Sequence, residues 1–295
     1  MSREISGKMK IKVYVVTYKK NDVLNANLKS LWESTKNPES IEVTVLANHP
    51  DVVIDEENKR ANLRLVLNTT RMSNAWGYLS RDWNYCLLDC FKTWEKPENI
   101  DWCVMAQNDV LWVKNWDEWL SHNKYYDFIS QPIGDQSLSI NIEALKKIGF
   151  FDERLTTLHF HEIDYFIRSM LFNKARVSIN DNHLKHNLSF NRVGNVITKT
   201  TFSGMNEDQT LHNSINFNES YHYISKKWGF DILQLGVPYI LENCHKLRRL
   251  NTEINWYPFF WNGFHGYKEL FDREIDTKTK SFLYRAVHFY WLRGK

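Results

Sequence analysis

The sequence lacks a long apolar run, a cysteine pair at metal-binding spacing and a large excess of either charge. No segment approaches the roughly twenty apolar residues of a membrane-spanning helix, and residues 1–12, MSREISGKMKIK, lack the apolar core of a signal peptide. A formal net charge of +3 over 295 residues is too small to indicate nucleic acid as a partner. These absences predict a cytoplasmic protein that does not bind nucleic acid.

The four cysteines, Cys86, Cys90, Cys103 and Cys244, show no CxxC spacing. Cys86 and Cys90 could share one face of a helix, which favours free thiols in a reducing compartment over a disulfide framework. The aromatic content is high, at 15% with 12 tryptophans. Aromatic faces suit sugar ligands, but composition by itself favours an aromatic-rich core.

Short apolar runs alternate with helical patterns through the first part of the chain, which predicts an open, mostly parallel α/β sheet. We expect strands at 11–20, 41–49, 62–68 and 101–110, and helices at 21–35 and about 76–94. Asn21 or Asp22 could cap the first helix. Because ligands bind such sheets beyond the carboxyl ends of the strands, one crevice could collect the polar residues found there: Thr17, Tyr18, Asn48, His49 and Gln107 to Asp109.

The second half is less regular. The patterns predict a strand at 127–132, a helix at 141–149 ended by Gly149, a helix at 161–175 and a strand at 175–180. The periodicity weakens beyond about residue 200. We therefore divide the chain into a catalytic domain, 1–200, and a C-terminal helical and aromatic extension, 201–295. Within the domain, 10–112 would form the nucleotide-sugar half and 113–200 the acceptor half.

Three positions carry candidate chemistry, each beside a structural alternative. Asp109 could anchor a divalent cation, or it could cap a turn. Glu162 could act as a general base at a crevice, or it could complement a helix dipole; Asp164 could pair with Arg168, four residues later. The loop after residue 180 offers His183 and His186.

Five segments carry a resemblance over residues 10–190: VYVVTYKKNDVLNANLKSLW, VTVLANH, GYLSRDWN, VMAQNDVLW and SLSINIEALKKIGFFDERL with the following HFHEIDYFIRSMLFNKARVSI. In this order they resemble a glycosyltransferase of family 2 with the GT-A fold. The resemblance implies nucleotide-sugar contacts at Thr17, Tyr18, Asn48, Arg81, Gln107 and Asn108. Asn48 or His49 replaces the usual acid of the second strand, and Asp82 stands where asparagine is common.

The same resemblance implies the reacting groups. Gln107 and Asp109 occupy the two positions of an Asp-x-Asp strand end, so Asp109 would be a metal ligand, completed by His186 in NHLKHN. Glu162 falls on the acceptor-activating base, and His161 replaces its usual glutamate neighbour. Asp164 matches a structural position and is the alternative base.

The resemblance thus implies an inverting hexosyl- or pentosyltransferase that uses Mn²⁺ or Mg²⁺, a nucleotide diphosphate-sugar donor and a glycan or lipid-linked glycan acceptor, as in polysaccharide biosynthesis. The replaced acids at Gln107 and His161 motivate an alternative, a non-catalytic glycan- or nucleotide-binding module on a degenerate transferase scaffold. A nucleotidyltransferase fits less well because no Gly-rich phosphate loop lies near the N-terminus. The basic, aromatic end KTKSFLYRAVHFYWLRGK could touch the inner membrane face, or it could pack on the catalytic domain.

Overall fold

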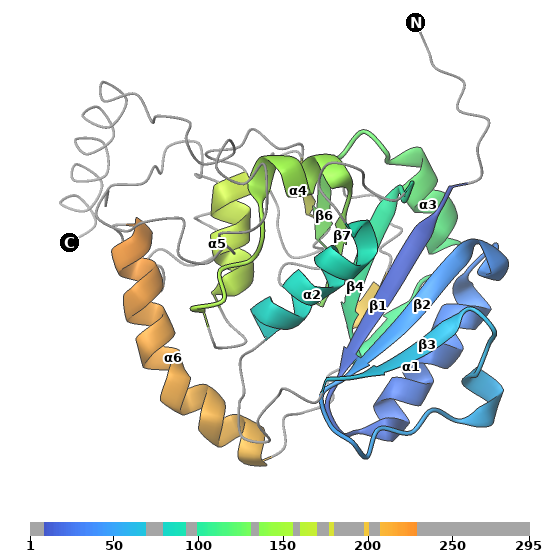
Figure 1. Cartoon of the computed structure of the whole chain (residues 1–295), viewed down its shortest axis with the longest axis horizontal. Helices are drawn as coiled ribbons and strands as arrows, with labels where there is room; N and C mark the ends of the chain where they lie inside the picture. The colour runs from blue at the N-terminus through green and yellow to red at the C-terminus, as the bar shows by residue number, and fades with distance from the viewer. Residues whose placement is uncertain are drawn as a thin grey trace, which may run out of the picture.

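The computed structural model describes residues 9–68, 79–92, 99–130, 136–155, 160–169, 177–179, 198–200 and 207–228, of which 177–179, 198–200 and 207–217 as backbone alone (Figure 1). Its centre is a seven-stranded sheet. The strands are β1 (Ile11–Thr17), β2 (Ile41–Ala47), β3 (Leu63–Leu67), β4 (Trp102–Gln107), β6 (Phe128–Ser130), β7 (Ser137–Ile140) and β8 (Val177–Ile179).

The sheet has the strand order β3-β2-β1-β4-β7-β6-β8. β1 pairs in parallel with β2 and with β4, β2 pairs in parallel with β3, and β6 pairs in parallel with β8. β7 is antiparallel to both of its neighbours, β4 and β6. The predicted α/β class and the single, mostly parallel sheet are therefore confirmed.

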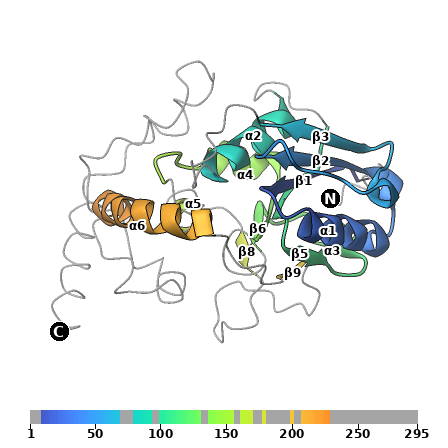
Figure 2. The same ribbon diagram turned by 90° about the horizontal axis from the view of Figure 1, so that it is seen from below.

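Helices cover both faces of this sheet. α1 (Asn21–Ser34) and α3 (Trp116–His122) lie on one face, and α2 (Leu79–Phe91), α4 (Ile142–Ile148) and α5 (His161–Ile167) lie on the other (Figure 2). β1 is buried along its whole length, because a parallel strand with helices on both faces has no solvent side. Cys86 and Cys90 on α2 are free thiols, as their spacing predicted, and they are buried in the core together with the free thiol of Cys103 on β4.

A second, two-stranded sheet follows β4 directly. β5 (Val110–Trp112) pairs antiparallel with β9 (Thr198–Thr200). The sequence predicted one strand through Val110, but β4 ends at Gln107 and a turn at Asn108 and Asp109 separates it from β5. Asn and Asp favour such turns because their side chains can hydrogen-bond the nearby backbone.

The predicted cap of α1 is wrong. The helix begins after Lys20, whose backbone is left-handed with φ 46°, and no side chain caps it. Asn21 instead donates from Nδ2 to the Asp51 carbonyl at 2.9 Å and accepts from the Val53 N–H at 3.0 Å. Its side chain therefore holds the segment after β2 and is not available to the helix.

A long helix, α6 (Glu207–Trp228), lies in the region predicted as an extension. The extension was predicted to be helical, but the position of this helix was not predicted. Both views place its C-terminal part beside α5 (Figures 1 and 2). No helix in the described part of the chain is long and apolar enough to cross a membrane. The aromatic C-terminal segments and His186 lie outside the described residues.

Candidate functional site

The carboxyl ends of β1, β2 and β4 meet at one edge of the sheet. The Asn48 N–H donates to the Thr17 carbonyl at 2.9 Å, and Asn108 Nδ2 donates to Thr17 Oγ1 at 3.0 Å. Gln107 is paired with Val16 in the sheet register. Four of the predicted nucleotide-sugar residues therefore lie together.

The loop after β1 lies at the same edge. The rings of Tyr18 and His49 meet edge to face at 5.4 Å, and Lys19 Nζ lies 5.3 Å from the Tyr18 ring centre. Lys19 and Lys20 have φ angles of 49° and 46°. This left-handed conformation costs roughly 1–2 kcal/mol for each residue with a β-carbon, and such strain concentrates at functional sites. The loop is thus held in a fixed, unfavourable shape beside the strand ends.

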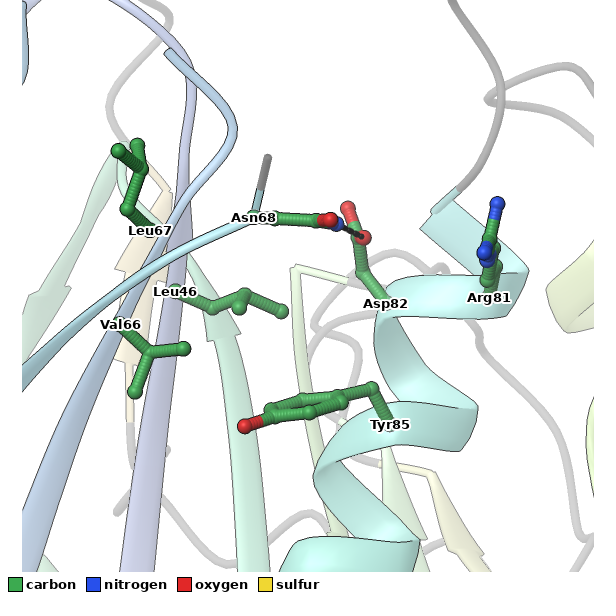
Figure 3. Close-up of a pocket in the computed structure, with 7 residues that line it drawn as sticks. All are labelled: Leu46, Val66, Leu67, Asn68, Arg81, Asp82 and Tyr85. Atoms are coloured by element: carbon green, nitrogen blue, oxygen red, sulfur yellow. Dashed lines mark hydrogen bonds between the residues drawn. The ribbon is translucent and has the colours of Figure 1, made fainter. Parts of the chain in front are cut away.

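A buried carboxylate joins these strand ends to α2. Asn48 Nδ2 donates to Asp82 Oδ2 at 2.6 Å, and Asn68 Nδ2 donates to Asn48 Oδ1 at 3.0 Å. Asn68 Nδ2 also donates to Asp82 Oδ1 at 3.3 Å (Figure 3). Asp82 is 1% exposed and lies in the first turn of α2, where the helix dipole favours a negative charge. Two of the predicted departures from the family 2 pattern, at Asn48 and Asp82, are therefore in direct contact.

A pocket of about 270 Å³ opens beside this network. Apolar side chains of β2 and β3 face it from one side and α2 from the other (Figure 3). It is lined by Leu46, Val66, Leu67, Asn68, Arg81, Asp82 and Tyr85. Arg81 was predicted as a nucleotide contact, whereas Asn68 and Tyr85 were missed. Asn68 follows a strand end, which is the signal that identified Asn48.

Hydrogen bonds made by Asn27 on α1 hold the turn that carries Asp109. Asn27, fully buried on α1, donates from Nδ2 to the Gln107 carbonyl at 3.1 Å and accepts from Trp112 Nε1 at 3.1 Å. The Gln107 N–H donates to the Gln136 carbonyl at 2.9 Å. Both sides of the turn are therefore fixed, and Asp109 lies half-buried between them.

These contacts allow a test of the predicted metal site. Within the described ranges, no three His, Cys, Asp or Glu side chains gather closely enough to hold a metal ion. A cation here would have one protein carboxylate, from Asp109, and His186 beyond the described residues. Mg²⁺ often accepts one or two carboxylates when substrate phosphates and water supply its remaining oxygen ligands. The donor set of Asp109 fits a cation that arrives with a diphosphate.

Glu162 lies in the first turn of α5. The residue that precedes this helix, Phe160, has an unusual backbone with φ 78° and ψ −30°. His161 is fully buried, with Nδ1 3.6 Å from Glu162 Oε2, and the Glu162 side chain is 12% exposed. The Glu162 carboxylate is therefore mostly shielded and lies at the N-terminal end of a helix, where the helix dipole favours its negative charge.

Asp164, the alternative base, has a different environment. Its carboxylate is fully buried and contacts Arg168 Nε at 2.9 Å, Lys227 Nζ at 2.6 Å and Trp228 Nε1 at 3.0 Å. Burial opposes its ionisation, but the charges and hydrogen bonds of Lys227 and Arg168 outweigh burial and hold the pKa of Asp164 below its usual value. The predicted pairing with Arg168 is confirmed. This geometry favours the structural role over the catalytic one.

Arg168 in turn connects α5 with the end of α4. Its Nη1 donates to the Ile148 carbonyl and its Nη2 to the Phe150 carbonyl, both at 2.7 Å. The chain reverses there at Gly149, whose φ is 82°. The Tyr165 hydroxyl donates to the Gly149 carbonyl at 3.1 Å. α5 and the GFFDE segment therefore form one hydrogen-bonded unit.

Among the comparisons with known proteins, only the comparison with solved structures found matches. No family model and no curated protein matches the sequence. The mannosyltransferase PcManGT from Pyrobaculum calidifontis, solved with GDP-Man and Mn²⁺, matches with 14% identity and a TM-score of 0.40 over 60% of this chain and 56% of that chain. S. aureus TarS matches with 12% identity and a TM-score of 0.48 over 80% and 43%. The galactosyltransferase LgtC, solved with donor and acceptor sugar analogs, matches with 14% identity and a TM-score of 0.30 over 44% and 58%.

The matched part spans about half the length of each of these three chains. At these identities and TM-scores the similarity says nothing about substrate or activity. Any statement on function therefore depends on the geometry of the site.

Proposed function

We propose that the chain is an inverting glycosyltransferase of the family 2, GT-A type, which moves a hexosyl or pentosyl group from a nucleotide diphosphate-sugar to a hydroxyl of a glycan acceptor. The observation that carries the proposal is the meeting of the polar ends of β1, β2 and β4 at one edge, beside the Arg81 pocket. Ligands of open α/β sheets bind at this edge.

On the donor side, the nucleotide would lie across Thr17, Asn48, Gln107 and Asn108, with Tyr18 and Arg81 beside it. The family places an acid at the second strand end, and here the acid comes from Asp82 on α2, in contact with Asn48. The chain thus has the amide, Asn48, at the strand end and the acid, Asp82, on the helix, which is the reverse of the family pattern. Arg81, which also lines the pocket, would add a positive charge beside the diphosphate.

Asp109, with His186, would hold Mn²⁺ or Mg²⁺ against the diphosphate. A bound cation supplies charge neutralisation for the leaving diphosphate. The contribution of the chain is a carboxylate on a turn fixed by Asn27, so that the diphosphate is oriented by a rigid element.

On the acceptor side, Glu162 would take the proton from the attacking hydroxyl. The acceptor oxygen bonds to the anomeric carbon from the face opposite the diphosphate, which leaves with the bonding electron pair, so the configuration inverts. Asp164 is occupied by Arg168, Lys227 and Trp228. This arrangement supports Glu162 as the base.

The test is calorimetric binding of UDP-, GDP- and dTDP-sugars with and without Mn²⁺, on the wild type and on Asp109→Ala. We expect one donor to bind in the presence of Mn²⁺ and to lose that metal-dependent binding in Asp109→Ala. Asp22→Ala, which removes an exposed carboxylate on α1, is the matched control and should bind normally. Binding that is absent or independent of metal would contradict the proposal and favour the non-catalytic module.

A further inference from the structure

Four charged side chains are buried together where α6 meets α5. Lys227 Nζ lies 2.8 Å from Asp152 Oδ2 and 2.6 Å from Asp164 Oδ1, and Arg168 Nε lies 2.9 Å from Asp164 Oδ2. None of the four side chains is more than 2% exposed. Two positive and two negative charges balance. Buried ions persist in proteins when they are paired in this way.

Two other residues in the last turns of α6 also contact the carboxylates that Lys227 binds. The Tyr223 hydroxyl donates to Asp152 Oδ2 at 2.8 Å, and Trp228 Nε1 donates to Asp164 Oδ1 at 3.0 Å. Asp152 follows α4, so α6 joins the end of α4 to the middle of α5. Figure 1 shows α6 beside α5, although the two helices are well separated in the sequence.

α6 also contacts the residue that precedes α5. The rings of Tyr221 and Phe160 lie 6.3 Å apart. Phe160 has the positive φ described above, and no side chain caps α5. The helical backbone continues as a π-helical turn at Arg168 and Ser169, where the described residues of this segment end. Most of the stability of a helix in a protein comes from tertiary packing of its buried face. The position of α5 therefore depends on its tertiary contacts.

These contacts fall on two sides of α5. Tyr165 and Phe166 pack toward the sheet, each with its ring 5.4 Å from that of Phe128. Asp164 faces α6 and is held by Lys227 and Trp228. The core fixes the distance of α5 from the sheet, and the charged contact fixes its position along α6.

We infer that Lys227 is a positioning residue for the transfer reaction: by binding Asp164 and Asp152 it fixes α5 and thereby the Glu162 carboxylate. The inference rests on the proposed function in so far as Glu162 is the base. It makes the C-terminal part of α6 a component of the acceptor half, although it lies beyond the predicted catalytic domain. A displacement of about 1 Å at such a group can cost 10²-fold in rate.

Lys227→Met removes the buried ammonium between the two carboxylates. It leaves Asp152 to the weaker contact with the exposed Arg154, whose Nε lies 3.8 Å from Asp152 Oδ1, so it also threatens folding. Asp152→Asn combined with Lys227→Met restores the charge balance, since Asp164 keeps Arg168 and the amide oxygen introduced by Asp152→Asn can still accept from Tyr223. The double variant therefore separates folding from positioning. Lys226→Met, an exposed neighbour on α6, is the matched control.

The measurements are kcat, the donor KM and amide hydrogen exchange of residues 161–167. We expect the folded double variant to lose about 10- to 100-fold in kcat, to keep its donor KM within about twofold because neither substituted residue is among the proposed donor contacts, and to exchange faster at α5. Lys226→Met should match the wild type in all three. A double variant with wild-type kcat and wild-type exchange at α5 would overturn the inference.

The exchange readout separates this inference from the proposed function. If the wild type transfers no sugar from any donor tested, the proposed function fails, but faster exchange of 161–167 in the folded double variant still supports anchoring of α5 by Lys227. Unchanged exchange contradicts it in either case. Trp228→Phe, which removes a single hydrogen bond to Asp164 and keeps all four charges, should show a smaller change in the same direction.

Discussion

Different contacts hold the two halves of the proposed site. The proposed donor edge is formed by the carboxyl ends of β1, β2 and β4, and the proposed acceptor helix is α5. At the donor edge, the strand register and short contacts among Asn48, Asn68 and Asp82 set the geometry. At the acceptor helix, a balanced cluster of buried charges reaches α5 from a helix much later in the chain. The sheet makes the donor side tolerant of distant changes, whereas the acceptor side depends on charge balance and therefore on distant residues.

The largest expected effect on stability comes from a substitution at the donor edge. Asn48→Asp places a second carboxylate where Nδ2 now lies 2.6 Å from Asp82 Oδ2. It should lower the free energy of unfolding by about 3 kcal/mol, the order of an uncompensated buried charge. Asp82→Asn alone should cost about 1 kcal/mol, because a charged acceptor is replaced by a neutral one. Urea unfolding measures both.

Combining the two changes gives the control for that prediction. Asn48→Asp with Asp82→Asn recreates one acid and one amide with exchanged partners, so the double variant should return to within about 1 kcal/mol of the wild type. A double variant as unstable as the sum of the two singles would show that the two side chains do not act as a pair. It would also remove the basis for an exchanged acid at the nucleotide site.

A smaller effect concerns acid stability at the acceptor helix. The pKa of Asp164 is lowered on folding, so its contribution to stability is complete above the unfolded aspartate pKa of about 3.9 and is lost as the pH falls through the lower folded value. The charge-balanced variant Asp152→Asn/Lys227→Met lacks one of the two cations that lower this pKa. Between about pH 5 and pH 2 it should lose less stability than the wild type, as measured by urea unfolding.

An exposed ion pair provides the comparison for that pH dependence. Glu143 and Lys146 lie 2.9 Å apart on the surface of α4. Exposed pairs of this kind contribute little to stability, so Glu143→Gln should leave the acid curve of the wild type unchanged. If Glu143→Gln reduced the loss of stability in acid as much as Asp152→Asn/Lys227→Met does, the buried cluster would not be the source of the pH dependence.

The sequence predicted the strand ends of β1, β2 and β4 better than the region of α5 and α6. Near-continuous apolar runs identified β1 and β2, and polar residues just after them identified Thr17 and Asn48. The end of β4 was misplaced because Val110 continues the apolar pattern after a two-residue turn. Register and turn geometry are set by pairing with other strands, and β5 pairs with residues 198–200, far along the chain.

α6 was missed for a physical reason. Among its described side chains, at 218–228, the buried ones include Ser220 and Lys227 as well as Ile224 and Trp228, so this part shows no clean apolar stripe. Lys227 stabilises the fold through a carboxylate 75 residues earlier, and no local pattern records such a contact. The GFFDE and HEIDYFIR motifs contain Asp152 and Asp164. Only the structure shows that Lys227 is the cation that pairs with both.

The central claim is sugar transfer with Glu162 as the base. The most direct measurement is release of nucleoside diphosphate and labelled product from UDP-, GDP- and dTDP-sugars, with a set of oligosaccharide acceptors, by the wild type and by Glu162→Gln. We predict transfer from one donor by the wild type and a loss of about 10²- to 10⁴-fold in Glu162→Gln, with donor binding retained. Glu162→Gln transferring at the wild-type rate, or a wild type that binds a donor without turnover, would contradict the account.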